Sequence, residues 1–215
     1  MSEMTLYGYW RSSAAYRVRI ALNLKQLNYQ QRSVHLVNEG GEQHQASFKS
    51  LNPSELVPVL VDGELQLNQS LTIIDYLDEQ YPGARLVPEM GMQRYLIRSL
   101  AQDIAIDIHP LNNLRVLQYL SGQFDLQAEH KDRWYKHWIE QGFASLETKL
   151  QGCRGRYCVG DEVSLVDVCL VPQVYNAERF NVDLSAYPII QEVTAALRAL
   201  PAFQNAAPEN QPDAE

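Results

Sequence analysis

The sequence predicts an α/β domain followed by an all-helical domain, and three observations support this. Up to about residue 83, short β-like runs alternate with helical patterns in the order strand, helix, strand, weak helix, strand, strand, helix. A proline-bounded linker follows at 81–88. Beyond residue 90 no convincing strand is found, and apolar residues recur with helical period. This order is typical of a thioredoxin-like domain at 1–83 and an all-helical domain at 89–215.

Composition and charge narrow the class of protein. Of the 215 residues, 46% are hydrophobic and 20% are charged, as in ordinary globular proteins. The chain has no apolar run of about 18 residues and no secretory signal, so we expect a cytoplasmic protein without a membrane span. A formal net charge of −8 argues against nucleic acid or an anionic membrane surface as a partner.

The stretch from Trp10 to Leu24 is predicted to be a helix whose N-terminus suits an anion. It follows a β-like run at 4–9, and Ser12 and Ser13 are both good N-cap residues. The unpaired N–H groups and the dipole of a helix favour negative charge at its N-terminus, and a thiolate is an anion.

Three arginines, Arg11, Arg17 and Arg19, form a basic cluster in an otherwise acidic chain. Arg17 lies four residues after Ser13 on the same face of the predicted helix, so its guanidinium is expected one turn below the hydroxyl. Such a cluster suits the attraction of a small anion. The alternative is that the serines only cap the helix while the arginines solvate its exposed side.

The rest of the first domain is predicted from pattern and turn residues. Its further elements are expected at 27–36 (strand), 43–50 (short helix), and 56–61 and 64–67 (hairpin). Pro58 marks a strand edge, and a cis Val57–Pro58 bond would leave the main chain of Val57 free to pair with an extended ligand. Ser70 is expected to cap a third helix, whose N-terminus would be a second place for a carboxylate.

The helical domain is predicted from two long amphipathic patterns. One apolar stripe spans 96–111 and is expected to kink or break at Pro110, and a second spans 134–150. Two or three shorter helices are expected between 165 and 203.

Two features near the end of the chain have structural interpretations. Ser164 and Asp167 form an acidic variant of the capping box, which explains the aspartate without any chemistry. The tail after Pro208 is polar, and we expect it to be loose.

Several catalytic classes lack their motifs in this chain. There is no G-x-S-x-G nucleophile elbow and no glycine-rich phosphate loop. His109 lies off the helix face that carries Asp103 and Asp107, so no metal site is expected. The cysteines lack redox or metal spacing and are expected to be reduced and mostly buried; they are Cys153, Cys158 and Cys169.

Sulfur chemistry in this protein would need a borrowed thiol. A glutaredoxin-type enzyme requires a cysteine at the start of the first helix, where this chain has Ser12-Ser13-Ala14-Ala15. The chain therefore cannot run disulfide exchange by itself. Glutathione is the obvious soluble source of a thiol.

Five motifs together resemble one family. They are RSSAAYRVRIAL at 11–22, VP at 57–58, QS at 69–70, YCVGDE at 157–162 and NAERF at 176–180. From Leu6 to about Phe203 the chain resembles the zeta-class glutathione transferases, also called maleylacetoacetate isomerases. The resemblance implies the glutathione transferase architecture, a thioredoxin-like domain joined to an all-helical domain. It also implies a homodimer with glutathione held in the N-terminal domain.

The resemblance further implies roles for individual residues. Ser12 is the implied catalytic hydroxyl that stabilises the glutathione thiolate, with Arg17 as a second catalytic residue. The implied glutathione-binding set is Ser12, Ser13, Ala14, Tyr16, Arg17, Gln43, Val57, Gln69, Ser70, His109, Asn113, Leu114 and Arg115. The forked guanidinium groups of Arg11, Arg17 and Arg179 would hold the carboxylates of a small dicarboxylate substrate.

The implied reaction is the isomerisation of maleylacetoacetate to fumarylacetoacetate in tyrosine and phenylalanine breakdown, by reversible addition of the thiolate. Maleylpyruvate as substrate, transfer to or dehalogenation of small α-halo acids, and a non-catalytic interaction module remain alternatives. Many family members carry cysteine directly after the two serines, where this chain has Ala14. Reactions ascribed to that cysteine are therefore not implied here, whereas isomerisation needs only the sulfur of glutathione.

Overall fold

The computed structural model describes residues 4–215. Contacts within the chain form two compact units: the first runs to Leu86 and includes Leu200–Glu215, and the second spans Val87–Ala199. The sequence analysis assigned everything from residue 89 onward to the helical domain, and the structure differs for Leu200–Glu215, which we call the C-terminal segment. No helix among the described residues is long and apolar enough to cross a membrane.

The first unit is built on a four-stranded sheet of order β2-β1-β3-β4. β1 pairs in parallel with β2 and antiparallel with β3, and β3 pairs antiparallel with β4. A helix connects the parallel pair, as such a crossover requires. The arrangement confirms the predicted thioredoxin-like order. The strands are β1 (Thr5–Gly8), β2 (Gln30–Ser33), β3 (Val59–Asp62) and β4 (Leu65–Asn68).

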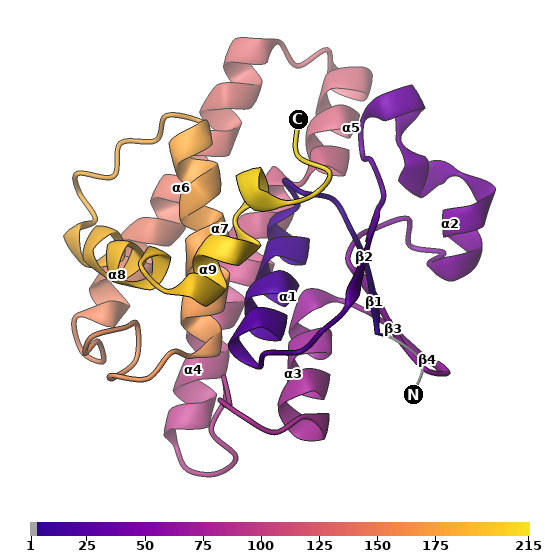
Figure 1. Ribbon diagram of the computed structural model, residues 1–215. Coiled ribbons are helices and arrows are strands. Elements are labelled where there is room, and N and C mark those ends of the chain that lie inside the picture. The colour runs from indigo at the N-terminus through magenta and orange to yellow at the C-terminus, as the bar shows by residue number, and fades with distance from the viewer. Residues whose placement is uncertain (1–3) are drawn as a thin grey trace. The chain divides into compact units, whose positions relative to one another are not determined.

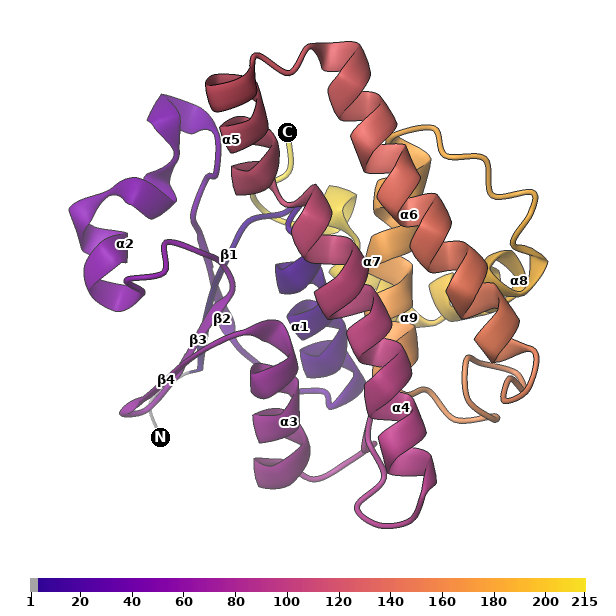
Figure 2. The ribbon, with the colours of Figure 1, turned by 180° about the vertical axis from the view of Figure 1, so that it is seen from behind.

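Helices cover both faces of this sheet. α1 (Ser13–Leu24) and α3 (Ser70–Gln80) pack together on one face, and α2 (Ala46–Leu51) lies on the other (Figures 1 and 2). The short helix expected at 43–50 is divided, because a separate tight turn covers Glu42–His44 before α2 begins.

Alternation along the strands supplies a core on each face of the sheet. Val59 forms a cluster with Val34 and with Phe48 of α2. The next residue, Leu60, points to the opposite face, where it pairs with Leu6, and both side chains are 1% exposed. The α1–α3 layer therefore packs on its own apolar surface.

The C-terminal segment is packed, so the expectation of a loose tail was wrong. α9 (Pro201–Ala206) packs on α1, and a 3-10 turn covers Pro208–Asn210. The side-chain amide of Gln211 donates to the carbonyls of Asn205 (2.9 Å) and Ala207 (2.8 Å). Polar residues thus stabilise this segment by bonding to its main chain, which an apolar pattern does not reveal.

The second unit is helical and is organised around α7. In the described part of the chain, α7 packs against both α4 and α8, and most of its residues are buried. Figure 2 shows α4, α6 and α7 from behind. The helices of this unit are α4 (Gln93–Gln102), α5 (Leu114–Phe124), α6 (Ala128–Leu150), α7 (Leu165–Arg179) and α8 (Pro188–Arg198).

The helix expected over 96–111 changes its winding after α4. A π-helical turn covers Asp103–Ile108, and a 3-10 turn that contains Pro110 covers His109–Asn112. The predicted interruption near Pro110 is confirmed, because proline has no N–H to continue the helix. Leu100, Ile104 and Ile108 are buried, whereas Leu96 is 40% exposed, so the apolar stripe was wrong at its first residue and its regular α-helical winding was not kept.

α7 begins at the predicted capping box. The Ser164 N–H and hydroxyl both donate to Asp167 Oδ2, each at 2.8 Å, and the Cys158 N–H donates to Oδ1 at 2.9 Å. Asp167 is 0% exposed, so its two oxygens are bonded inside the protein. The structural interpretation of this aspartate is confirmed.

Candidate active site

Three of the expected site segments in the first unit end at one edge of the sheet. Val59, at the start of β3, pairs with Tyr7 near the end of β1 and with Asn68 at the end of β4. The loop before α1, the residues before β3 and the start of α3 therefore meet at this edge. These segments carry Ser12, Val57 and Gln69.

Ser12 caps α1 and remains half-exposed. Its Oγ accepts the N–H of Ala15 at 3.2 Å, while the first turn of α1 contains no acidic residue. The positive end of the helix dipole is therefore not neutralised by a carboxylate of its own turn. A hydroxyl accepts through lone pairs and donates through its hydrogen, so Ser12 can cap the helix and donate to an anion simultaneously.

Arg17 is buried beside the start of α3. Arg17 is 2% exposed, and its Nη1 donates to Ser70 Oγ at 3.3 Å. Ser70 is not the N-cap that the sequence analysis expected: Gln69 precedes the helix and Ser70 is its first residue. The contact with Arg17 places a guanidinium beside the first residue of α3.

Gln69 adopts an uncommon backbone conformation. Its φ is 69° and its ψ is 111°, and it is exposed. Non-glycine residues with positive φ are uncommon and concentrate where surrounding structure fixes them, often at ligand sites. Here the conformation turns the chain sharply from β4 into α3 at the sheet edge.

Gln43 lies inside the turn before α2 and is 5% exposed. Its Nε2 donates to the Leu36 carbonyl at 3.4 Å and lies 3.1 Å from His44 Nε2. Gly41 has a φ of 104°, and a Cβ there would come within 2.5 Å of the Gln43 amide nitrogen. The amide is therefore held by its own turn, which only glycine accommodates.

Four further expected residues of this unit differ in their exposure. The Val57–Pro58 bond is cis, the form considered from the sequence, and the Val57 side chain packs on the Val34, Phe48 and Val59 cluster. Ala14 is half-exposed near the start of α1. Two others are buried and face the interior: Ser13 (5% exposed) and Tyr16 (3% exposed).

Arg19 is a structural residue, so the basic cluster that was expected to attract a small anion was wrong at this position. It is 1% exposed, its Nε donates to the Ala206 carbonyl at 3.0 Å, and its Nη2 donates to the Trp10 carbonyl at 2.9 Å. Burial lowers the pKa of the guanidinium to about 10. Helical spacing cannot reveal this role because Ala206 is distant in sequence.

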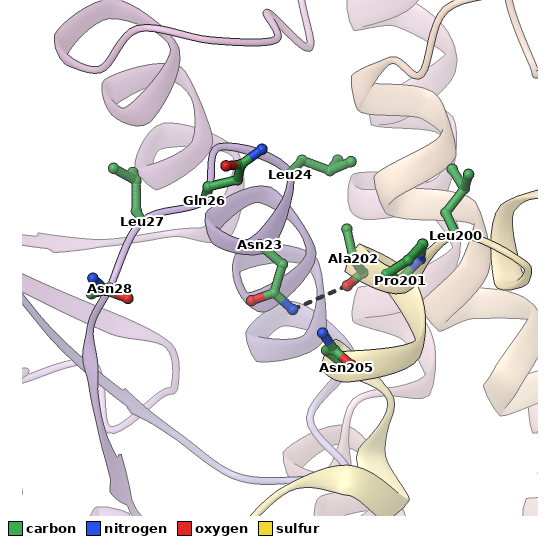
Figure 3. Close-up of a pocket in the computed structure, with 9 residues that line it drawn as sticks. All are labelled: Asn23, Leu24, Gln26, Leu27, Asn28, Leu200, Pro201, Ala202 and Asn205. Atoms are coloured by element: carbon green, nitrogen blue, oxygen red, sulfur yellow. Dashed lines mark hydrogen bonds between the residues drawn. The ribbon is translucent and has the colours of Figure 1, made fainter.

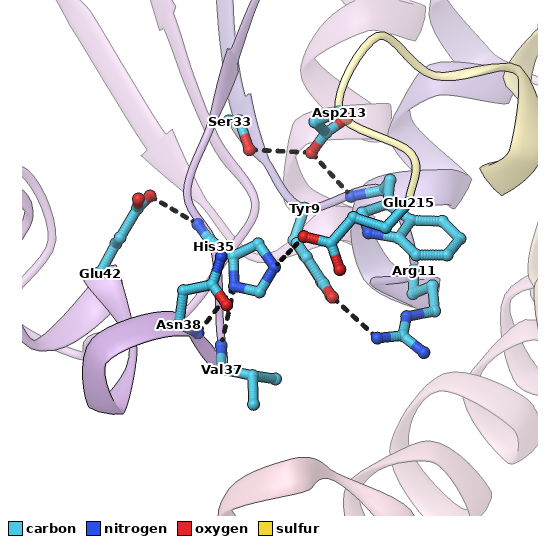
Figure 4. Close-up of polar contacts among 10 residues, drawn as sticks. Tyr9, Arg11, Ser33, His35, Val37, Asn38, Glu42, Asp213 and Glu215 are labelled. Atoms are coloured by element: carbon cyan, nitrogen blue, oxygen red, sulfur yellow. Dashed lines mark hydrogen bonds and ion pairs between the residues drawn. The ribbon is translucent and has the colours of Figure 1, made fainter.

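Arg11 is the half-exposed member of the three arginines. Its Nη2 donates to the Tyr9 hydroxyl at 3.0 Å, and its guanidinium lies 4.6 Å from the centroid of the Trp10 ring. Tyr9 in turn packs edge-to-face on His35. Figure 4 shows these residues around the loop before α1. Tyr9 and Trp10 thus hold the positively charged Arg11 side chain in one direction, at the same edge of the sheet as Ser12.

The sequence analysis missed the polar residues of the C-terminal segment that surround this loop (Figure 4). Asp213 accepts the Trp10 N–H at 3.1 Å and the Ser33 hydroxyl at 2.9 Å, and Glu215 lies 2.9 Å from His35 Nε2. No local pattern marks these acids, because their partners lie 180 to 203 residues away in the chain.

Four other expected residues belong to the second unit. Asn113 caps α5, its Oδ1 accepting the Arg115 N–H at 3.2 Å. This cap uses the side-chain oxygen of Asn113 and does not involve its amide nitrogen. His109 begins the 3-10 turn and is half-buried, Leu114 is the first residue of α5, and Arg115 is exposed.

Arg179 ends α7 as an exposed cation beside an aromatic pair. Its guanidinium lies 5.0 Å from the Phe180 ring centroid, and that ring stacks on Tyr135 at 3.6 Å. Burial raises the pKa of Tyr135 to about 12, against a smaller lowering by the charge of Arg179. Tyr135 is therefore a neutral phenol near pH 7, and Arg179 supplies the local charge.

A cavity of about 560 Å³ lies at the other end of α1 (Figure 3). The Asn23 amide donates to the Ala202 carbonyl there at 3.0 Å. No expected site residue lines this cavity, so it is separate from the Ser12 end of the helix. Its lining is Asn23, Leu24, Gln26, Leu27, Asn28, Leu200, Pro201, Ala202 and Asn205.

Two of the three free thiols are made poor nucleophiles by burial. Cys153, Cys158 and Cys169 are free, and burial raises the pKa of the first two. Among residues 4–215, no group of three histidine, cysteine, aspartate or glutamate side chains could hold a metal ion.

Comparison with known proteins assigns the chain to a family. The glutathione S-transferase N-terminal domain family matches residues 6–85, and the glutathione S-transferase C-terminal domain family matches residues 114–201. The chain is 67% identical to a probable maleylacetoacetate isomerase of Vibrio cholerae serotype O1, with 100% of each chain covered.

Two solved structures have the same fold. One is the holo structure of a maleylpyruvate isomerase, a bacterial zeta-class glutathione transferase, with 46% identity, coverage of 98% and 100%, and a TM-score of 0.94. The other is a maleylacetoacetate isomerase from Methylobacterium extorquens AM1 with bound malonate and glutathione, with 40% identity, coverage of 98% and 99%, and a TM-score of 0.94. The chain therefore belongs to the glutathione transferase family, in the zeta class that contains the maleylacetoacetate isomerases.

Proposed function

We propose that this protein is a glutathione-dependent cis–trans isomerase that converts maleylacetoacetate to fumarylacetoacetate. The observation that carries the proposal is the start of α1, where a half-exposed Ser12 hydroxyl caps a helix with no acid in its first turn. Such a helix N-terminus stabilises an anion. Glutathione supplies the thiolate that adds to the substrate double bond and leaves again, so that the bond rotates while it is single.

The sheet edge fits a tripeptide thiol. Ser12 donates its hydroxyl hydrogen to the sulfur, while the α1 N-terminus supplies a positive potential. The main chain of Val57, just before β3, pairs with the extended peptide. The start of α3, with Ser70 held by Arg17, receives the γ-glutamyl carboxylate. The side-chain amides of Gln69 and Gln43 donate further hydrogen bonds to glutathione. The Gln43 amide must first break its bonds within its own turn.

In this proposal, arginine side chains bind the carboxylates of the substrate. Arg11, half-exposed and held by Tyr9, binds one carboxylate in the bidentate manner that a guanidinium permits. Arg179 is the second candidate, as an exposed cation. Arg17 is buried, so we assign it a supporting role: its charge lowers the energy of the thiolate and the γ-glutamyl carboxylate without solvent exposure.

Maleylpyruvate is the second candidate substrate. It is favoured by the similarity of this chain to the maleylpyruvate isomerase of the zeta class at a TM-score of 0.94. Both acids are cis dicarboxylates, so the same cations serve either.

The test is an assay of the purified protein with maleylacetoacetate, maleylpyruvate and a small α-halo acid, each with and without glutathione. We expect isomerisation of a cis dicarboxylate only when glutathione is present. Calorimetry should show saturable glutathione binding, which a non-catalytic interaction module would lack. No rate above background with any of the acids would refute the proposed function.

We further propose that the protein works in the cytoplasm as a homodimer. Free cysteines fit a reducing compartment. Large apolar side chains at and before α4 are exposed, with Met92 at 82%, Tyr95 at 62% and Leu96 at 40%, which is typical of a surface that meets a partner. Light scattering after size-exclusion chromatography should give twice the chain mass, and Tyr95→Glu should reduce it; a monomeric wild type would contradict this.

A further inference from the structure

The main chain of Trp10 is tied to the C-terminal segment directly at its N–H and through Arg19 at its carbonyl. Its N–H donates to Asp213 Oδ2 at 3.1 Å. Its carbonyl accepts from Arg19 Nη2 at 2.9 Å, and the Nε of the same arginine donates to the Ala206 carbonyl at 3.0 Å. Trp10 precedes Arg11 and Ser12 directly, so these bonds act on the loop that presents both groups.

Asp213 also joins this loop to β2. Its Oδ2 accepts the Ser33 hydroxyl at 2.9 Å, and its Oδ1 accepts from the Gln31 amide at 3.0 Å. Each oxygen therefore has a donor, and three segments of the first unit meet at one carboxylate. A hydrogen bond to a charged group is stronger than one between neutral groups.

Glu215 reaches the loop through His35 (Figure 4). The Nδ1 of His35 accepts the N–H groups of Val37 (3.2 Å) and Asn38 (2.8 Å), so the ring proton lies on Nε2 and is donated to Glu215 at 2.9 Å. The ring fixed in this way packs on Tyr9 with centroids 4.9 Å apart. The Tyr9 hydroxyl then accepts from Arg11.

We propose that Asp213 and Glu215 are positioning residues that set the direction of Arg11 for the carboxylate of the substrate. Asp213 fixes the main chain before Arg11, and Glu215 fixes the aromatic support of its guanidinium. This inference rests on the proposed function, because it takes Arg11 as a carboxylate-binding group. Loss of the two acids leaves Arg11 charged but misdirected, so dicarboxylate affinity falls more than glutathione affinity.

The experiment compares the wild type with Asp213→Ala, Glu215→Ala and the double variant. Malonate binding is measured by calorimetry in the presence of glutathione, together with KM for the dicarboxylate, glutathione affinity and Tm. The double variant should bind malonate about tenfold more weakly, with glutathione affinity changed less than about threefold. Glu64→Gln, exposed in the β3–β4 turn, removes one negative charge elsewhere and should leave all values unchanged.

Two further variants separate positioning from general loss of structure. Glu215→Gln keeps an acceptor for His35 and should restore most of the affinity that Glu215→Ala loses. In an Arg11→Ala background the Glu215→Ala change should have no further effect on malonate binding, since the group it positions is gone. The Glu215 side chain is 57% exposed, so this substitution remains usable where the double variant does not fold.

The outcomes are distinguishable from those of the proposed function. A wild type that isomerises no acid refutes the function, while malonate binding still decides the positioning inference. Equal malonate affinity in the wild type and the folded variants overturns the inference, as does an undiminished effect of Glu215→Ala in the Arg11→Ala background. A wild type that does not bind malonate overturns it as well.

Discussion

Among residues 4–215, two helices begin at a serine cap, and one of the two has a carboxylate bonded to that cap. At α7, Ser164 is 4% exposed and Asp167 accepts from its N–H and hydroxyl. At α1, Ser12 is half-exposed and the first turn has no acidic residue. The same local sequence signal therefore serves the fold in one helix, whereas in the other it leaves the positive end of the dipole to an outside anion.

The difference lies at position N3 of each helix. α7 carries Asp167 there, and α1 carries Ala15, whose N–H bonds to the Ser12 hydroxyl. A carboxylate at N3 of α1 would add negative charge to the helix N-terminus at which the thiolate of glutathione is proposed to lie. The proposed chemistry therefore requires a first turn without an acid, and the missing carboxylate is not a defect of the cap.

The largest expected effect comes from removing each cap in turn. Ser12→Ala and Ser164→Ala should each lower the free energy of unfolding by about 1 kcal/mol, because each removes a cap. Only Ser12→Ala should lower kcat, by about 100-fold, since it alone removes a donor to the sulfur. Denaturant unfolding and steady-state kinetics of both variants provide the check, and equal kcat losses in the two would contradict the distinction.

The closed helix should depend on its carboxylate for stability alone. Asp167→Asn leaves one of three buried donors poorly satisfied and should cost about 2 kcal/mol. Its kcat should stay close to that of the wild type where the protein is folded. Thermal unfolding and turnover of the same preparation measure the two quantities, and a loss of kcat without a loss of stability would be the opposite result.

A cysteine introduced at N2 of α1 and of α7 reports the electrostatic potential at the N-terminus of each helix. Ala14→Cys restores the residue that many family members carry, at a half-exposed position whose helix N-terminus should lower the thiol pKa below about 8.5. Val166→Cys is its matched control, at a position that is 0% exposed. Iodoacetamide should modify the first about tenfold faster than a free cysteine at neutral pH.

The pH profile of that modification separates charge from exposure. The rate for Ala14→Cys should reach half its maximum below pH 8.5, about the pKa of an ordinary cysteine. The Val166→Cys rate should remain close to the wild-type background. A half-maximum at or above the ordinary cysteine value would show that the N-terminus of α1 stabilises no anion.

The smallest effect concerns the pH dependence that Asp167 gives to stability. Burial raises the pKa of this carboxyl above its ordinary value of 3.8. The folded state then binds the proton more tightly than the unfolded state, so this contribution is present below pH 3.8 and is lost as pH rises through the folded pKa. The stability difference between the wild type and Asp167→Asn should therefore shrink as pH rises over this range. Unfolding of both proteins measured across the acid range tests this pH dependence. A stability difference that widens as pH rises would contradict it.

Local signals predicted much of the fold. Ser12, Ser164 and Asp167 act within one helical turn, so the caps of α1 and α7 could be identified from the sequence. Such features depend on neighbours in the chain, which is why they were predicted. The Val57–Pro58 bond is cis, a form that the sequence analysis considered but could not decide.

Long-range partners explain what was not predicted. Ser70 was expected as a cap, but its hydroxyl bonds to Arg17, 53 residues earlier. Arg19 was expected in an anion-attracting cluster, but its Nε donates to a main-chain carbonyl of α9. The acids of the C-terminal segment were overlooked for the same reason. A helical wheel gives the face of a residue but not the acceptor that the fold brings to it.

The central claim is that the open N-terminus of α1 and the Ser12 hydroxyl lower the pKa of a borrowed thiol. Its most direct test is a titration of the thiolate absorbance of bound glutathione in the wild type, Ser12→Ala and Ser164→Ala. We predict a thiol pKa at least about 1 unit below that of free glutathione in the wild type and in Ser164→Ala, and a return towards the free value in Ser12→Ala. A bound thiol that titrates like free glutathione in the wild type, or a shift that survives Ser12→Ala undiminished, would contradict the claim.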